Sequence, residues 1–196
     1  MKTYLSALLL TFAPFLRAID SPTPDHGVQA VREMVRGDSG KWNDSPILQV
    51  IPPPTNRPPG MNLDTWADTL REIPMKLQTG KDVWLLFRSR QLDDNDRVWV
   101  ESIQRSGENI TVRMHEAVWQ GNYFKTFTYY AVLGVNLGRI PAGNYSVAWI
   151  VEPFTFTKLN GDGRPFRRDG TPQGWPKDAT PTHAETVKLQ TKLSIQ

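Results

Sequence analysis

The chain has 196 residues, a net charge of +3, no cysteine and seven tryptophans. This length is enough for about one domain with a substantial hydrophobic core, and without cysteine that core must hold the fold without disulfides. Lys2 and Arg17 fall in the leader described next, so the rest of the chain carries only 3 − 2 = +1, which gives no argument for nucleic-acid binding. The missing cysteines favour a bacterial envelope protein over an animal extracellular one.

Residues 1–18 have the pattern of a cleavable secretory signal. Lys2 supplies a positive charge, Tyr4 to Phe15 is almost uncharged and apolar, and Ala18 is a small residue at which a signal peptidase cuts. The apolar run, of about 12–13 residues, is shorter than the ~20 residues that span a bilayer. We therefore expect a secreted or periplasmic protein that does not span the membrane. A buried core helix is the alternative for this run.

Residues 19–61 are expected to form a loosely organised N-terminal region. Asp25 is a candidate cap for a short helix that ends at Gly37. One face of this helix would carry Val28, Val31 and Val35. Residues 47–51 form a short apolar run that predicts a strand.

The next segment, residues 52–60, contains five prolines and predicts a stiff, extended linker. After it, residues 62–74 predict a short helix, with Asn62 as a possible cap and Pro74 as the stop. Apolar residues recur through it at helical spacing: Leu63, Trp66, Ala67, Leu70 and Ile73.

From residue 75 the apolar period changes to two, which predicts a β-sandwich domain over residues 75–196. Short turns separate the alternating runs, so we expect a mainly β, antiparallel fold. The clearest inward set is Tyr145, Val147, Trp149 and Val151. Residues 158–185 are rich in Gly, Pro, Asp and Arg and predict a long loop before a final strand.

The stretch from Leu137 to Val147, Leu-Gly-Arg-Ile-Pro-Ala-Gly-Asn-Tyr-Ser-Val, resembles a phrase of secreted bacterial β-sandwich modules of immunoglobulin-like and transthyretin-like type. Pro141 and Gly143 suit the turn, and Tyr145 and Val147 begin the next strand with side chains in the core. The resemblance covers only these residues. It implies an immunoglobulin-like sandwich and says nothing of activity.

No pattern in the sequence predicts a metal or catalytic site. His26, His115 and His183 lack metal-ligand spacing. The runs 93–96 and 160–163 gather oxygen ligands that calcium favours, but neither continues into the full spaced loop with a downstream Glu. We expect polar turns at both.

Two regions are candidate ligand sites. Trp84 and Trp99, together with His115, fall on the strand face opposite the most apolar one, where exposed rings would stack on sugars or on a partner's aliphatic groups. The alternative is that both faces are covered, one of them by the 62–74 helix or by the long loop. The second region is that loop, which mixes cations with aromatic residues: Arg164, Arg167, Arg168 and Trp175. It suits an anion or acidic glycan, or it is a solvated loop anchored by its tryptophan.

From these observations we expect an exported, non-catalytic β-sandwich without a cofactor. It would bind a glycan or another envelope or extracellular protein, or serve as a component of the cell envelope. The alternative is a secreted hydrolase or an enzyme inhibitor with its site in the 158–185 loop, because carboxylates distant in sequence can still converge in a cleft.

Overall fold

The computed structural model describes residues 30–36, 45–71, 73, 75–93, 95–121, 128–158, 176 and 178–196. The predicted leader, residues 1–18, lies outside this part of the chain. So does most of the predicted long loop.

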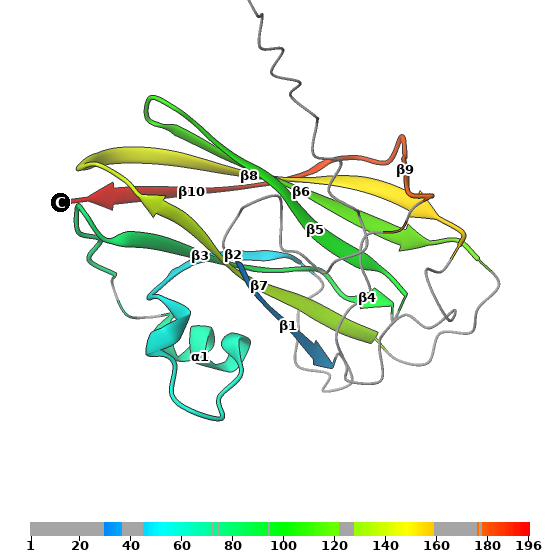
Figure 1. Cartoon of the computed structure of the whole chain (residues 1–196), viewed down its shortest axis with the longest axis horizontal. Coiled ribbons are helices and arrows are strands. Elements are labelled where there is room, and N and C mark those ends of the chain that lie inside the picture. Colours follow the sequence, from blue (N-terminus) through cyan, green and yellow to red (C-terminus); the bar gives the residue numbers. More distant parts are fainter. Residues whose placement is uncertain are drawn as a thin grey trace, which may run out of the picture.

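The described chain is mainly β and forms two sheets (Figure 1). Sheet A has the order β1 (Ala30–Arg36), β7 (Thr128–Arg139), β3 (Asp82–Arg88) and β2 (Ile47–Ile51), with β4 (Leu92–Asp93) also paired to β7. Sheet B has the order β10 (Val187–Ile195), β8 (Gly143–Phe156), β6 (Asn109–Trp119) and β5 (Arg97–Ser106), with β9 (Thr180–Pro181) also paired to β8. The two sheets are compatible with a β-sandwich.

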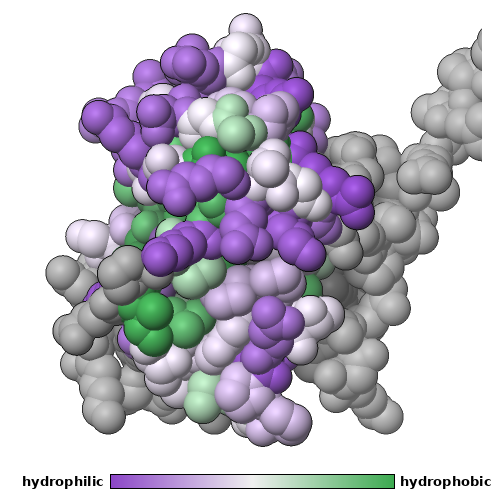
Figure 2. Space-filling model, turned by 90° about the vertical axis from the view of Figure 1, so that its left-hand side faces the viewer, coloured by the Kyte–Doolittle hydropathy of each residue, from purple (hydrophilic) through white to green (hydrophobic). Residues whose placement is uncertain are grey.

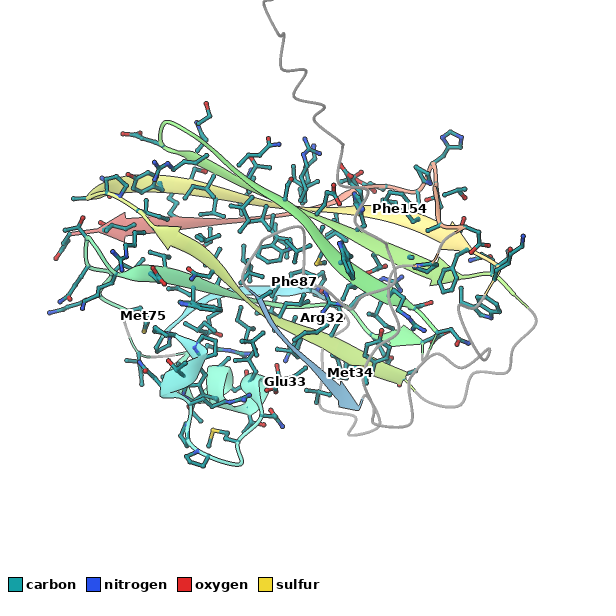
Figure 3. All side chains as sticks on the ribbon, in the orientation of Figure 1. Arg32, Glu33, Met34, Met75, Phe87 and Phe154 are labelled. Carbon is teal, nitrogen blue, oxygen red and sulfur yellow. The ribbon has the colours of Figure 1, made fainter. Side chains whose placement is uncertain are left out.

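The inward faces of both sheets share one hydrophobic core, as the period of two predicts. The predicted inward set of β8 is confirmed, with Tyr145 9%, Val147 0%, Trp149 0% and Val151 5% exposed. Trp149 of sheet B stacks on Phe87 of sheet A, with ring centroids 5.0 Å apart and planes 4° from parallel. Figure 3 labels Phe87 between the two layers.

One strand pair departs from the expected antiparallel pattern. β6 and β8 run parallel, with Asn109 opposite Ser146 and Trp119 opposite Phe156. A parallel pair needs a crossover connection, and here the chain passes through β7 of sheet A between the two strands. The alternation of each strand is unchanged by its direction, which is why the sequence pattern could not distinguish the two arrangements.

The short helix predicted around Val31 and Val35 is wrong, because residues 30–36 form strand β1. Residues four apart share one face of a helix and also one face of a strand, so the valine spacing fitted both. In the structure β1 pairs with β7 along its whole length. Ala30 and Met34 pack on the main core, whereas Val31 and Val35 pack on a second cluster beneath the helix.

The N-terminal segment is part of sheet A, which corrects the expected division of the chain at residue 75. β2 forms at the predicted residues and pairs with β3, while β1 completes the opposite edge of the sheet. The proline-rich segment is not simply an extended linker. It contains a 3-10 helix, Pro54–Asn56, and a Cβ added at Gly134 of β7 would lie 3.3 Å from the Pro54 ring.

The predicted helix is confirmed as α1 (Leu63–Leu70), which covers the outer face of sheet A. Its predicted cap is also confirmed, since the Asn62 side chain accepts a hydrogen bond of 2.7 Å from the Thr65 N–H. Leu63 and Trp66 are 0% and 5% exposed and pack with Ile51 on the sheet. α1 therefore seals the second apolar cluster from water.

Candidate functional site

The candidate site is a groove at the end of the sheets where α1 lies and β10 ends (Figure 1). It consists of two hollows on either side of Met75 and Leu77, and we call the pair the end groove. The first hollow has a volume of about 480 Å³ and the second about 270 Å³. Figure 2 looks at this end and shows hydrophobic surface set among hydrophilic side chains.

The first hollow lies between the proline-rich segment and the start of β3. Its lining combines the apolar residues Ile51, Pro52, Pro53 and Val83 with the cations Lys76, Lys81 and Arg139. The chain reaches it through a tight turn, in which the Lys81 N–H donates to the Gln78 carbonyl and Gly80 has a φ of 77°. A positive φ favours glycine, so Gly80 sets the direction in which the chain enters β3.

The second hollow lies between the edges of the two sheets. β2 contributes Gln49 and Val50, and β10 contributes residues 192–194. The segment after α1 supplies Ile73, which is 54% exposed and one of two exposed large hydrophobic residues in the described chain. Figure 3 places Met75 beside α1 at this end.

The wall between the hollows is held by Gln196, which directly follows β10. The Gln196 N–H donates to the Leu77 carbonyl at 3.0 Å, and the Thr79 N–H donates to the Gln196 carbonyl at 2.8 Å. Leu77 and Ile195 thus form an isolated parallel bridge beside β10. The end groove is therefore built by main-chain bonds rather than by side chains alone.

The charge of the end groove is positive. Five cations line its two hollows: Arg71, Lys76, Lys81, Arg139 and Lys192. The described lining has a single carboxylate, Asp82, which accepts a hydrogen bond of 3.1 Å from Asn136 and lies 3.7 Å from Arg139. Arg71 contacts Asp68 at 2.6 Å, outside the lining. This excess of cations over an apolar floor suits an anionic ligand that has apolar parts.

Behind the groove, buried charges attach α1 to sheet A. Asp64 and Arg88 are 2% and 3% exposed and approach to 3.4 Å. Burial raises the pKa of the Asp64 carboxyl, and the Arg88 guanidinium opposes this shift. Glu33 of β1 accepts a hydrogen bond of 2.6 Å from the Leu63 N–H and pairs with Arg57. These contacts fix the helix whose last turn borders the second hollow.

The aromatic face expected from Trp84 and Trp99 does not exist, because the two residues lie on different sheets. Trp84 is on β3 of sheet A, 6% exposed, and packs in the cluster beneath α1. For the face of sheet A that carries Trp84, the alternative that the 62–74 helix covers it is confirmed. Trp99 is on β5 of sheet B, and the Arg32 guanidinium lies 5.5 Å from its ring centroid.

The outer face of sheet B carries a charged network around His115. Its Nε2 lies 3.1 Å from Glu152, and Glu152 also accepts a hydrogen bond of 2.6 Å from Arg113. Phe154 lies 4.5 Å from the imidazole, and Glu101 lies 3.9 Å from its Nδ1. The register of β5, β6 and β8 brings these residues together across three strands, so their spacing in the sequence gave no sign of the network.

The described residues of the oxygen-rich run 93–96, which are Asp93, Asn95 and Asp96, lie at a turn, as expected. The Asp96 N–H donates to the Asp93 carbonyl, and the Asp96 carboxylate accepts bonds from the N–H groups of Asp93 and Trp119 at 3.0 and 2.9 Å. Burial raises the pKa of Asp96, and these two bonds oppose the shift. The carboxylate thus joins β4 to the end of β6. Within the described ranges, no group of three or more His, Cys, Asp or Glu residues could hold a metal ion.

A third hollow, of about 370 Å³, lies at the other end of β6 and β8. Its described lining includes Glu116 and Glu185, and Arg90 donates two hydrogen bonds to one oxygen of Glu116, at 2.9 and 2.5 Å. The buried carboxylate of Glu116 is therefore already engaged in an ion pair with Arg90.

The other predicted ligand residues lie outside the described chain: Arg164, Arg167, Arg168 and Trp175. The same holds for the run 160–163. Nearer the ends of the loop, Asp178 accepts hydrogen bonds from the N–H groups of Thr157 and Lys158, and β9 pairs with β8. A site in the loop stays a prediction.

Comparison with known proteins gave no match to a family model, to a curated protein or to a solved structure. In the part of the chain that the structure describes, none of the helices has the length and apolar character needed to cross a membrane. Sequence reasoning missed the end groove, because its cations come from three segments far apart in the sequence: the connection between α1 and β3, the end of β7, and β10. The available signal was the pair Lys76 and Lys81 just before β3.

Proposed function

We propose that this chain is an exported, non-catalytic protein with an immunoglobulin-like β-sandwich, and that it binds an acidic, partly apolar segment of another protein in its end groove. The predicted leader over residues 1–18 supports a secreted or periplasmic location. The partner would then be another envelope or extracellular protein. No cofactor is needed for this function.

The observation that carries the proposal is the charge of the end groove over an apolar floor. Lys76, Lys81 and Arg139 surround the first hollow, and the carboxylate of Asp82 is already contacted by Asn136 and Arg139. Complementary charge steers an anionic partner to such a surface and fixes its register. The exposed side chain of Ile73 adds an apolar contact beside the cations.

The lining chemistry favours a protein partner over a glycan. The described residues of the end groove include no aromatic side chain on which a sugar ring would stack. Trp84 is buried beneath α1, and Trp99 is already in contact with Arg32. The groove offers cations, amides and aliphatic groups, which suit binding, and its described lining pairs no nucleophile with a base.

The proposal is tested by calorimetric titration of the full chain with a short synthetic peptide that alternates Glu and Val. We expect Lys81→Ala/Arg139→Ala to weaken binding by at least about tenfold and to reduce its salt dependence, since both cations face the ligand. The matched control, Arg105→Ala/Lys158→Ala, removes the same charge from exposed positions outside the groove and should bind like the wild type. Equal losses in both variants, or no binding by the wild type, would contradict the proposal.

A further inference from the structure

Within the described part of the chain, few main-chain groups bond to the outer edge of β10. β10 is the last strand of sheet B and pairs with β8 along one side only. On the other side, the main-chain bonds to the described residues are the two that Gln196 makes with Leu77 and Thr79. An edge of this kind is a template for another strand.

The direction of each main-chain group follows from these two bonds. The N–H and the carbonyl of one strand residue point to the same side, and successive residues alternate. Because both groups of Gln196 face the Leu77 segment, the residues at even positions face the same outer side: Lys188, Gln190, Lys192 and Ser194.

The partner strand gives the same assignment independently. The Ser146 N–H of β8 donates to the Glu108 carbonyl, just before β6, at 2.9 Å. Even residues of β8 therefore face β6, and odd residues such as Val147 and Trp149 face β10. Their opposite residues, Thr191 and Leu189, must bond to β8. The even residues of β10 are left facing outward.

We propose that this edge binds its partner by strand addition, as a further main-chain pairing along Lys188–Ser194. This inference rests on the proposed function and specifies how the part of the acidic segment that lies in the second hollow is held, while the part that contacts Lys81 and Arg139 lies in the first hollow. The bridge between Leu77 and Ile195 shows that the edge already accepts an extended partner at one end. The second hollow continues from that bridge along residues 192–194, so there is open space beside this part of the edge.

The side chains along the edge define the sequence of the added strand. Inward-facing positions of the added strand enter the second hollow, which is lined by Val50, Ile73 and Leu77. Outward-facing positions lie beside the exposed side chains of Lys188 and Lys192. Opposite charges across a strand pair stabilise it. The partner is therefore an extended segment that alternates apolar and acidic residues.

A second copy of this chain fits the edge poorly. Antiparallel pairing of two β10 edges around Gln190 sets Lys188 opposite Lys192 of the other copy, and like charges directly opposite each other are destabilising. The exposed hydrophobic residues are consistent with a heterologous strand: Ile73, 54% exposed, lies in the second hollow beside residues 192–194, and Val187, 39% exposed, begins β10 and lines the third hollow. An added strand would run from one to the other.

Amide hydrogen exchange tests the pairing residue by residue. In the free chain the amides of Lys188, Gln190 and Lys192 should exchange fast, whereas those of Leu189 and Thr191 should be protected. The Glu-Val peptide should slow exchange at Lys188, Gln190 and Lys192, while the odd amides change little. Protection that ignores this alternation contradicts strand addition.

A variant and a modified peptide test the same pairing by affinity. Gln190→Pro removes an outward N–H and is tolerated at an edge, so the chain should fold and bind the peptide at least about tenfold more weakly. The matched control, Gln190→Ala, should bind normally. If Gln190→Pro proves too unstable, two N-methylated peptides replace it, one modified at every Glu and the other at every Val. Only one set of peptide N–H groups faces β10, so one peptide should lose binding and the other retain it.

The outcomes separate this inference from the proposed function. If the peptide does not bind the wild-type chain, both are wrong. If it binds and depends on Lys81 and Arg139, but the β10 amides and both N-methylated peptides show no effect, the groove binds its ligand and strand addition is wrong. Alternating protection together with loss for one N-methylated peptide supports both.

Discussion

Trp149→Ala should be among the most destabilising substitutions in the described chain. The side chain is 0% exposed and stacks on Phe87 at 5.0 Å. Burying a tryptophan side chain removes about 150–250 Å² of surface from water. At about 25 cal/mol per Å² of apolar surface, this burial stabilises the folded state by about 4–6 kcal/mol. Measured aromatic-to-alanine losses of roughly 3–5 kcal/mol agree with this range. We therefore expect a loss of about 3–5 kcal/mol in the free energy of unfolding, measured by urea titration.

Trp149→Phe is the matched control for this prediction. The indole Nε1 of Trp149 is buried and has no hydrogen-bond partner among the described residues, and an unpaired buried donor costs roughly 1–3 kcal/mol. Phenylalanine keeps the stack on Phe87 and removes that donor, so it should cost clearly less than alanine. A loss below about 1 kcal/mol for Trp149→Ala would refute the assignment of this residue to the core between the sheets.

Three further predictions concern charge, export and the long loop. Burial raises the pKa of Asp64 above its usual 3.8, so ionisation of this carboxyl costs stability in the folded state. The wild type should therefore lose stability relative to Asp64→Asn as the pH rises from below 3.8 through the folded-state pKa. Urea titrations of both proteins from about pH 3 to 7 check this, and a stability difference that changes in the opposite direction contradicts it. Mass spectrometry of the exported protein should find an N-terminus at or near Ile19, whereas intact Met1 outside the cytoplasm would contradict the leader. A variant in which Arg164, Arg167 and Arg168 of the loop are all replaced by alanine should lower the thermal midpoint far less than Trp149→Ala does. If this variant melts at a lower temperature than Trp149→Ala, the loop has a structural role and its assignment as a ligand site is wrong.

Sequence patterns predicted the parts of the fold that depend on local periodicity. The alternation of Val147 and Trp149 located a strand and its buried face, and the cap at Asn62 located the start of α1. The spacing of Val31 and Val35 failed, because four residues fit one face of either a strand or a helix. Pairing with β7 decided between them, and pairing is a property of distant residues.

The candidate site depends on the same non-local information. Lys81 and Arg139 line one hollow only because β3 and β7 are neighbours, with Asp82 opposite Arg139. The tryptophans misled for a related reason. Trp84 and Trp99 both oppose an apolar face along their own strands, yet the topology places them on different sheets. Which residues share one face of a sheet depends on the order of the strands, and the composition and spacing of the sequence do not determine that order.

The most direct test of the account is a charge swap along the β10 edge. The full chain and its Lys188→Glu/Lys192→Glu variant are each titrated by calorimetry with two peptides, one alternating Glu and Val and the other alternating Lys and Val. Wild type should bind the Glu peptide and reject the Lys peptide. The variant should bind the Glu peptide at least about tenfold more weakly and bind the Lys peptide better than wild type does, because the swapped charges lie beside the added strand while the cations of the first hollow are unchanged. Unchanged preferences in the variant would contradict recognition at this edge.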